Sequence, residues 1–178
     1  MSAMNALKVL LVNHVMIDLA KEYGKSCCSL VEPEAGYCLT IRFVPEDAIV
    51  FKCDSFPNTG EVFFNGRSGE CKRADYVLVS ESEKVIMIFE LQKSNRKTAH
   101  EITAQLKGAK CIVDYCESIS SEFLGMHDIF CGFTYRYYKS INTAPRKRAF
   151  GKEEKPANQT PETARIIPGS SIPFDFLM

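Results

Sequence analysis

Tryptophan is absent from this chain of 178 residues, and long apolar runs are absent as well. The longest run of apolar side chains covers only residues 85–89, whereas a membrane-spanning helix needs about 20 such residues. The first residues also lack the basic start, apolar stretch and small-residue cleavage site of a signal peptide. We therefore expect no transmembrane segment and a cytoplasmic location.

The chain also has no formal net charge, because its 22 basic residues balance 22 acidic ones. This balance argues against general affinity for nucleic acid or membranes, although it leaves room for a local basic groove. Eight cysteines are present, but no CxxC spacing occurs, and the chain is not a short secreted scaffold. We expect reduced thiols and no zinc site.

The composition that is present is that of one globular domain. Hydrophobic residues make up 46% of the chain and charged residues 25%, and twelve Phe and seven Tyr supply large core side chains. The length suits a single domain with a real core. Five of the eight prolines lie in residues 140–178. We therefore assign residues 1–139 to the domain and 140–178 to a Pro-rich loop or tail.

The first segment with a clear period covers residues 4–23. Apolar side chains recur there at steps of three and four, which predicts one helix that ends before Gly24. The apolar stripe is wide, so this helix is expected in the core or in a dimer interface. The residues that define the stripe are Leu7, Leu10, Leu11, Ile17 and Ala20.

Short β-rich segments follow. YCLTIRF, AIVFKCDSF and EVFF, within residues 37–64, are separated by turn residues. The clearest hairpin consists of residues 74–80 and 85–92, joined by the turn ESEK. Its second strand is apolar on both faces as far as Phe89, which is typical of a central strand covered on both sides.

A long helix and a further strand complete the expected order. Thr98 and Glu101 form a capping-box pattern, and the apolar spacing continues to about Phe123. Residues 127–138 are a strand candidate, and 140–168 should be loop. The apolar end, SIPFDFLM, is expected to dock back onto the protein. The order predicts an α/β (α+β) layered domain.

The hairpin turn fixes a register that places two acids opposite each other. With a tight turn centred between Ser82 and Glu83, paired residue numbers sum to 165, so Asp75 faces Glu90 with Cβ atoms about 5 Å apart. Such a pair is destabilising unless a cation lies between the carboxylates, and a hard divalent ion suits oxygen ligands. Gln92 shares the face of Glu90, whereas Lys93 points to the other face unless the strand bulges.

These residues resemble a known motif. Asp75, then FELQK at 89–93 and AQLKGA at 104–109, look like the core of the PD-(D/E)xK, restriction-endonuclease-like nucleases, here as an E-x-Q variant. The resemblance covers residues 70–138. It implies a mixed sheet whose central hairpin is flanked by helices, and an endonuclease-type, Mg²⁺-dependent (or Mn²⁺-dependent) hydrolysis of DNA.

The resemblance also implies roles for single residues. Asp75, Glu90 and the Leu91 carbonyl would bind the metal, and the catalytic set would be Asp75, Glu90, Gln92 and Lys93. Ala74 replaces the usual proline, and Gln92 stands at the usual lysine position. Because glutamine supplies no charge, that charge must come from elsewhere. We expect Gln92 to occupy the site while a lysine of the helix region, Lys97 or Lys107, supplies it; the alternative is Lys93 displaced by a bulge.

Other residues have a functional and an ordinary interpretation. Glu70 either completes the metal shell or is a solvated loop residue. Gln105 either matches the family glutamine that supports the site or is an exposed helix residue. Four basic residues are candidate phosphate contacts or simply the solvated face of a helix. They are Arg96, Lys97, Lys107 and Lys110.

The resulting hypothesis is a Mg²⁺-dependent deoxyribonuclease, working as a dimer or as a subunit of a defence or repair complex. DNA is the expected partner, with a second copy or another protein as further partners. The first alternative is an inactive module of the same fold that binds nucleic acid or protein. A further alternative is an interaction domain that uses the N-terminal helix and SIPFDFLM to bind another protein. The acids would then have no role in function.

Overall fold

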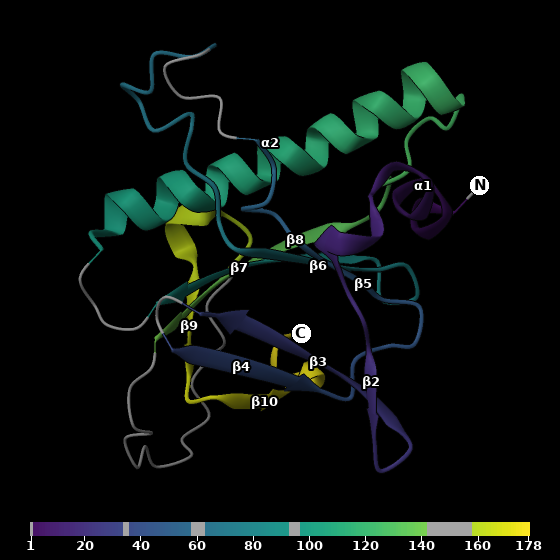
Figure 1. Ribbon diagram of the computed structural model, residues 1–178, viewed down its shortest axis with the longest axis vertical. Coiled ribbons are helices and arrows are strands. Elements are labelled where there is room, and N and C mark those ends of the chain that lie inside the picture. Colours follow the sequence, from purple (N-terminus) through teal and green to yellow (C-terminus); the bar gives the residue numbers. More distant parts are fainter. Residues whose placement is uncertain (1, 34–35, 58–62, 93–96, 142–157) are drawn as a thin grey trace.

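The computed structural model describes residues 2–33, 36–57, 63–92, 97–141 and 158–178. Two β-sheets and two α-helices form layers, in which the six-stranded sheet lies between α2 on one side and the four-stranded sheet on the other (Figure 1). The architecture is a mixed α/β fold, in agreement with the expected class. Neither α-helix of the described residues is long and apolar enough to cross a membrane.

The six-stranded sheet has the order β1-β5-β6-β7-β8-β9. The pairs β1–β5, β5–β6 and β6–β7 are antiparallel, whereas β8 is parallel to both β7 and β9. The helix α2 connects β7 with β8, as a parallel crossover requires. The strands are β1 (Met16–Ile17), β5 (Ile49–Lys52), β6 (Tyr76–Ser80), β7 (Val85–Gln92), β8 (Thr134–Ile141) and β9 (Arg165–Pro168).

The four-stranded sheet has the order β10-β4-β3-β2. Its first pair, β10 and β4, is parallel, and the other two pairs are antiparallel. Its strands are β2 (Ala20–Glu22), β3 (Lys25–Glu32), β4 (Tyr37–Arg42) and β10 (Ser171–Pro173). The sequence predicted only β4 of these, so the second sheet as a layer was missed.

The central hairpin agrees with the predicted register. Tyr76 pairs with Phe89 and Val77 with Ile88, so paired residue numbers sum to 165. All residues of β7 are buried, which confirms the prediction of a central strand. The strand also pairs regularly with β8 up to Gln92, opposite Ile141. Gln92 therefore shares the face of Glu90, and no bulge interrupts the strand before it.

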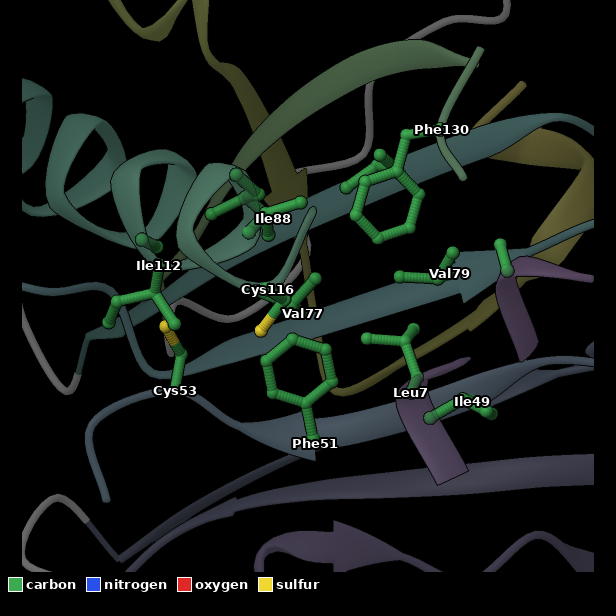
Figure 2. Close-up of a cluster of buried hydrophobic side chains, with 14 of the residues drawn as sticks. Leu7, Ile49, Phe51, Cys53, Val77, Val79, Ile88, Ile112, Cys116 and Phe130 are labelled. Atoms are coloured by element: carbon green, nitrogen blue, oxygen red, sulfur yellow. The ribbon is translucent and has the colours of Figure 1, made fainter. Parts of the chain in front are cut away.

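A hydrophobic core fills each side of the six-stranded sheet. Figure 2 shows the helix side, where Phe51, Val77 and Ile88 of the sheet face Ile112 and Cys116 of α2. On the other side, alternate residues of the same strands, such as Leu78 and Met87, contact the four-stranded sheet. Burial of both faces explains why the pattern of β7 is continuously apolar.

The helix α2 (Ala99–Leu124) lies within a residue of its predicted bounds. Thr98 and Glu101 form the predicted capping box, and Gly125 ends the helix in the left-handed conformation, with φ of 62°. At Gly108 the helix approaches a loop so closely that a Cβ atom would lie 1.7 Å from the Lys72 carbonyl oxygen. This contact fixes the chain that leads to Asp75.

The prediction of one helix over residues 4–23 is wrong. Helix α1 covers only Ala3–Leu10 and is followed by the 3-10 turn Asn13–Val15 and by the edge strands β1 and β2. β-branched residues at 9, 12 and 15 disfavour a longer helix, and pairing of Met16 and Ile17 with β5 satisfies the backbone instead. Tertiary pairing thus overrides an apolar spacing of three and four.

The C-terminal part differs from the sequence prediction at several points. The strand expected at 127–138 is β8, shifted to Thr134–Ile141, because residues 127–133 form an irregular segment with a turn at 129–132. Of the loop expected over 140–168, residues 142–157 lie outside the described part, and β9 is a strand paired with β8. The expected docking of the end is confirmed, since Ile172 pairs with Ile41, and Phe174 and Leu177 are buried.

The expected strand EVFF is not present as such. Residues 61–62 lie outside the described residues, and Phe63 and Phe64 belong to neither sheet. Both aromatic rings are exposed and contact each other edge to face, with centroids 4.9 Å apart. A pair of bulky side chains with high strand propensity therefore lies in a loop.

Candidate functional site

Carboxylates gather at the open end of the β6–β7 hairpin. Asp75 directly precedes β6, and hydrogen bonds to both neighbouring strands hold its backbone. Its N–H donates to the Phe89 carbonyl at 3.1 Å, and its carbonyl accepts from the Cys53 N–H at 2.8 Å. Asp75 therefore lies one residue beyond the last pair of the ladder, Tyr76 with Phe89, and the direct pairing of Asp75 with Glu90 stays a prediction.

Both carboxylates of this pair are taken out of water. Glu90 is fully buried and Asp75 is 8% exposed. Asp75 and Glu90 are each two residues from Val77 and Ile88, which face α2, so strand alternation puts the pair on the helix side of the sheet. Asp75 Oδ2 accepts a hydrogen bond from the Leu91 N–H at 2.6 Å. The two acids therefore share one buried site.

Burial and the charges of neighbouring acids raise the pKa of both carboxyls. Burial, followed by the charge of Glu90, raises the pKa of Asp75 to about 8, although the Leu91 N–H opposes this change. Burial also raises the pKa of Glu90 to about 7, against the lowering influence of Lys97. Both shifts mean that the site disfavours the charged forms of the two carboxyls. A bound cation would stabilise these charged forms.

Lys97 supplies a positive charge to this site. It directly precedes the cap residue Thr98, and its Nζ lies 2.6 Å from Glu90 Oε1. Burial lowers the pKa of Lys97, but the bond to Glu90 outweighs this and leaves the pKa raised. The ammonium is therefore charged at neutral pH. This geometry agrees with the expectation that a lysine of the helix region reaches the acids.

Asp75 also belongs to a cluster of three acids. Carboxylate oxygens of Glu32, Asp54 and Asp75 all lie within 4.8 Å of one another, and this cluster can hold a metal ion. Glu32 ends β3 of the four-stranded sheet, and Asp54 follows β5. The cluster thus combines residues from both sheets.

The Tyr76 hydroxyl explains how Glu32 reaches this place. It donates a hydrogen bond to the Val31 carbonyl at 2.6 Å and accepts one from the Val31 N–H at 3.1 Å. Tyr76 follows Asp75, and Val31 precedes Glu32, so the two hydrogen bonds connect the residues next to these two acids. We call this pair of hydrogen bonds the Tyr76–Val31 clamp.

Several buried polar atoms at the site have no hydrogen-bond partner. Glu90 Oε2 and both amide atoms of Gln92 are buried and unpaired. Such groups carry a free-energy cost in the metal-free chain and indicate a ligand or ordered water. Gln105 Nε2 donates to the Arg73 carbonyl at 3.3 Å, and its amide helps lower the pKa of Glu90. Gln105 thus supports the segment before Asp75.

Other predicted site residues have partners elsewhere. The Glu70 carboxylate accepts from the Ser68 N–H at 2.8 Å within its own turn. Lys107 Nζ lies 2.7 Å from Glu162, and Lys110 Nζ lies 2.6 Å from Asp114. Of the predicted lysines that the structure describes, Lys97 is the one brought to the acids. Lys93 and Arg96 lie outside the described residues.

Sequence reasoning missed Glu32 and Asp54. Asp54 carried a usable signal, because it lies just beyond the apolar part of the predicted strand AIVFKCDSF, close to the end where Asp75 begins the next strand. Glu32 carried no comparable signal, since β3 was not predicted and its contact with Tyr76 joins distant segments. The Leu91 N–H has a place at the site, and the role of its carbonyl stays a prediction.

No family model, curated protein or solved structure matches this chain in sequence or structural comparison. The function must therefore be argued from the chemistry of the site itself.

Proposed function

We propose that this protein is a Mg²⁺- or Mn²⁺-dependent nuclease with a restriction-endonuclease-like core that hydrolyses phosphodiester bonds in DNA. One observation carries the proposal. Asp75 and Glu90 are both buried at the open end of the β6–β7 hairpin, and the Lys97 ammonium lies 2.6 Å from Glu90. Two acids and one cation at such a place are what metal-assisted phosphodiester hydrolysis requires.

The order of the elements supports the proposal. Three antiparallel strands, β5, β6 and β7, are followed by α2 and then by β8, which is parallel to β7. This arrangement has the central hairpin and flanking helix that the resemblance over residues 70–138 implies. The helix also covers the face that carries both acids.

The residues present fit a hard divalent ion. Carboxylate oxygens are the ligands that Mg²⁺ and Mn²⁺ prefer, and Glu90 Oε2 is buried without a partner. Asp75 and Glu90 would hold the ion, together with the Leu91 carbonyl. When bound, such an ion polarises a phosphate and lowers the pKa of a water.

The chain's own residues then divide the remaining work. Lys97 offers a positive charge to a phosphate, which Gln92 does not carry. Gln92 lies beside Glu90 and can orient a water through its unpaired amide. Gln105 holds the Arg73 carbonyl and so keeps the approach to Asp75 in place. The missing lysine of the motif is thus replaced by one from the start of the helix.

A cleavage assay with three variants tests this proposal. Single-stranded DNA, double-stranded DNA and RNA are incubated with the full chain and Mg²⁺ or Mn²⁺. Glu90→Gln and Lys97→Met should each remove most of the metal-dependent cleavage, whereas Lys21→Met should not, because Lys21 pairs with Glu46 on the other sheet. Equal rates for Lys97→Met and Lys21→Met would refute the role of Lys97.

The second candidate is a nuclease-fold module that binds nucleic acid without cutting it. Gln92 at the usual lysine position favours this candidate, because it removes a charge from the site. DNA binding that persists in EDTA, without cleavage in Mg²⁺ or Mn²⁺, would support it. Cleavage that Glu90→Gln abolishes would exclude it.

A further inference from the structure

We propose that residues 63–73, which we call the aromatic loop, form a contact surface for single-stranded DNA. An unpaired base stacks on the Phe63 ring, and the side chains of Arg67 and Lys72 contact the phosphate backbone. The proposal deepens the proposed function and rests on it for the choice of DNA as the partner. The binding experiment below separates the two.

Two phenylalanines at the start of the aromatic loop expose their rings. Phe63 is 80% exposed and Phe64 is 45% exposed. The rings contact each other edge to face at an interplanar angle of 86°, so one flat base can stack on only one of them. Phe63 has the more open ring. Unpaired bases stack on such rings, because every base has a π-face, and each stacked base typically changes the affinity by roughly 5–150-fold.

Charge distinguishes this aromatic surface from another exposed ring. Phe123, near the end of α2, is 77% exposed. Residues 117–128, which include it, contain three acids and no lysine or arginine. The aromatic loop has the opposite balance, since it contains three basic residues and one acid. They are Arg67, Lys72, Arg73 and Glu70. A polyanion is therefore attracted to the aromatic loop and repelled by the end of α2.

The basic side chains of the loop are accessible to a phosphate. Lys72 Nζ lies 3.6 Å from a Glu101 carboxylate oxygen, and the two side chains are 45% and 41% exposed. Such a solvent-screened pair stabilises little, so a phosphate can replace the carboxylate. Arg67 is exposed, and its backbone N–H donates to Asn65 Oδ1 at 3.1 Å, which holds the turn.

Close packing against α2 supports the aromatic loop. A Cβ atom at Gly69, where φ is 83°, would lie 2.9 Å from the Ala104 Cβ, and the Lys72 carbonyl lies against Gly108. Figure 1 shows the loop beside the first half of α2, with its start projecting beyond the helix. The rings are thus carried by a segment that is anchored before DNA binds, which lowers the entropy cost of binding.

The aromatic loop leads directly to the candidate site. The carbonyl of its last residue, Arg73, accepts from Gln105 Nε2 at 3.3 Å, and Asp75 follows two residues later. Lys97, which contacts Glu90, directly precedes the cap of the helix against which the loop packs. DNA that the loop holds is therefore bound next to the segments that carry the acids and their cation.

Fluorescence anisotropy in EDTA measures binding to the full chain without cleavage. The probes are a labelled oligothymidine, a DNA duplex of equal length and an oligouridine, and the oligothymidine should bind most tightly. Phe63→Leu should weaken its binding at least about fivefold, whereas Phe63→Tyr should retain it, because tyrosine keeps the ring and leucine keeps only the apolar character. Phe123→Leu is the matched control, because Phe123 is equally exposed but lies among acids. It should bind normally.

Salt dependence tests the two cations. The logarithm of the affinity for single-stranded DNA falls with the logarithm of the salt concentration, with a slope of about −0.7 per phosphate contact. Arg67→Gln and Lys72→Met should each make the slope shallower by about this amount. Lys21→Met should not, because Lys21 pairs with Glu46 on the other sheet. Circular dichroism confirms that each variant is folded, and unchanged slopes in both loop variants would overturn the role of these cations.

The outcomes separate this inference from the nuclease hypothesis. Equal oligothymidine affinities of Phe63→Leu and the unmodified chain would overturn the inference, even if the protein cleaves DNA. Tighter binding of the duplex or the oligouridine would also overturn it, as would the absence of oligothymidine binding. Binding that depends on the Phe63 ring supports it, even if the protein cleaves nothing in Mg²⁺ or Mn²⁺.

Discussion

The two ends of the β6–β7 hairpin treat an aspartate in opposite ways. At the turn, Asp47 accepts hydrogen bonds from the Glu81 N–H at 2.8 Å and from the Ser82 N–H at 2.7 Å. The Ser80 and Ser82 hydroxyls also donate to it. Burial favours the neutral form of Asp47, but these bonds outweigh it and lower its pKa. At the open end, Asp75 is buried beside Glu90, and its pKa is raised.

The difference separates a carboxylate that the chain itself compensates from one that it compensates only in part. Asp47 has its charge fully compensated by donors of the chain, so the turn is complete as it stands. Asp75 accepts one N–H bond, from Leu91, and has a neighbouring acid that Lys97 offsets only in part, so its charge is less well compensated. Burial also differs, because Asp47 is only partly buried whereas Asp75 is 8% exposed.

The strongest test of this comparison is Asp75→Asn. We expect metal-dependent cleavage to fall by at least about 100-fold, because a neutral amide neither holds the ion nor stabilises the developing charge as a carboxylate–metal site does. The free energy of unfolding in EDTA at neutral pH should stay the same or rise, because the substitution removes repulsion with Glu90. Cleavage rates and urea denaturation measure the two effects.

Loss of both activity and stability in Asp75→Asn would contradict this assignment, since it would make Asp75 structural like Asp47. Glu70→Gln serves as a control for removing an acid, because Glu70 is bonded within its own turn.

The pH dependence gives the next largest effect. A carboxyl whose pKa is raised on folding stabilises the metal-free protein fully below about pH 4, and this contribution disappears as pH rises through the folded pKa, to about 8 for Asp75 and about 7 for Glu90. Cations need the deprotonated form, so Mn²⁺ affinity should increase with pH by up to about tenfold per unit for each proton released. Titrations at pH 6 and pH 8 measure it. Equal affinities would show that the acids are already ionised at pH 6.

The matching substitution at the turn, Asp47→Ala, should lower the stability of the protein without changing its cleavage activity. Removing this acceptor leaves two backbone N–H groups without their partner, which should lower the free energy of unfolding by roughly 2 kcal/mol. Cleavage per folded molecule should be unchanged. Denaturant titration and an assay corrected for the folded fraction check both statements, and a stable but inactive variant would refute them.

The smallest effect is expected at Gln92. Gln92→Lys should preserve or raise cleavage, because the position lies beside Glu90 and a lysine would add charge near the phosphate. Initial rates against the unmodified chain measure this change. A silent Gln92→Ala together with an inactive Lys93→Ala would instead favour a bulged strand after Leu91.

Local signals predicted the half of the site that depends on neighbouring residues. The ESEK turn fixed the register of the hairpin up to Tyr76 and Phe89, next to Asp75 and Glu90. Thr98 with Glu101 fixed the start of α2, and Lys97 just before it lies beside Glu90. Both signals act over a few residues. The resemblance to a nuclease motif also depended on this local part.

Long-range contacts account for what was missed. Glu32 reaches the site because Tyr76 binds the backbone of Val31 across two sheets, and no pattern within either segment encodes that bond. The extended helix over 4–23 failed for the same reason, because Met16 and Ile17 find partners in β5. Such edge strands form because they pair with a neighbouring strand, and their own sequence does not predict them.

Strands β9 and β10 cover an edge of each sheet. Strand β9 pairs with β8 of one sheet, and β10 pairs with β4 of the other, while Ile167, Ile172 and Phe174 fill the core between the sheets. Without residues 165–173, one edge of β8 and one edge of β4 would expose unpaired backbone groups, which can pair with another chain. This segment therefore protects both sheets against edge-to-edge aggregation.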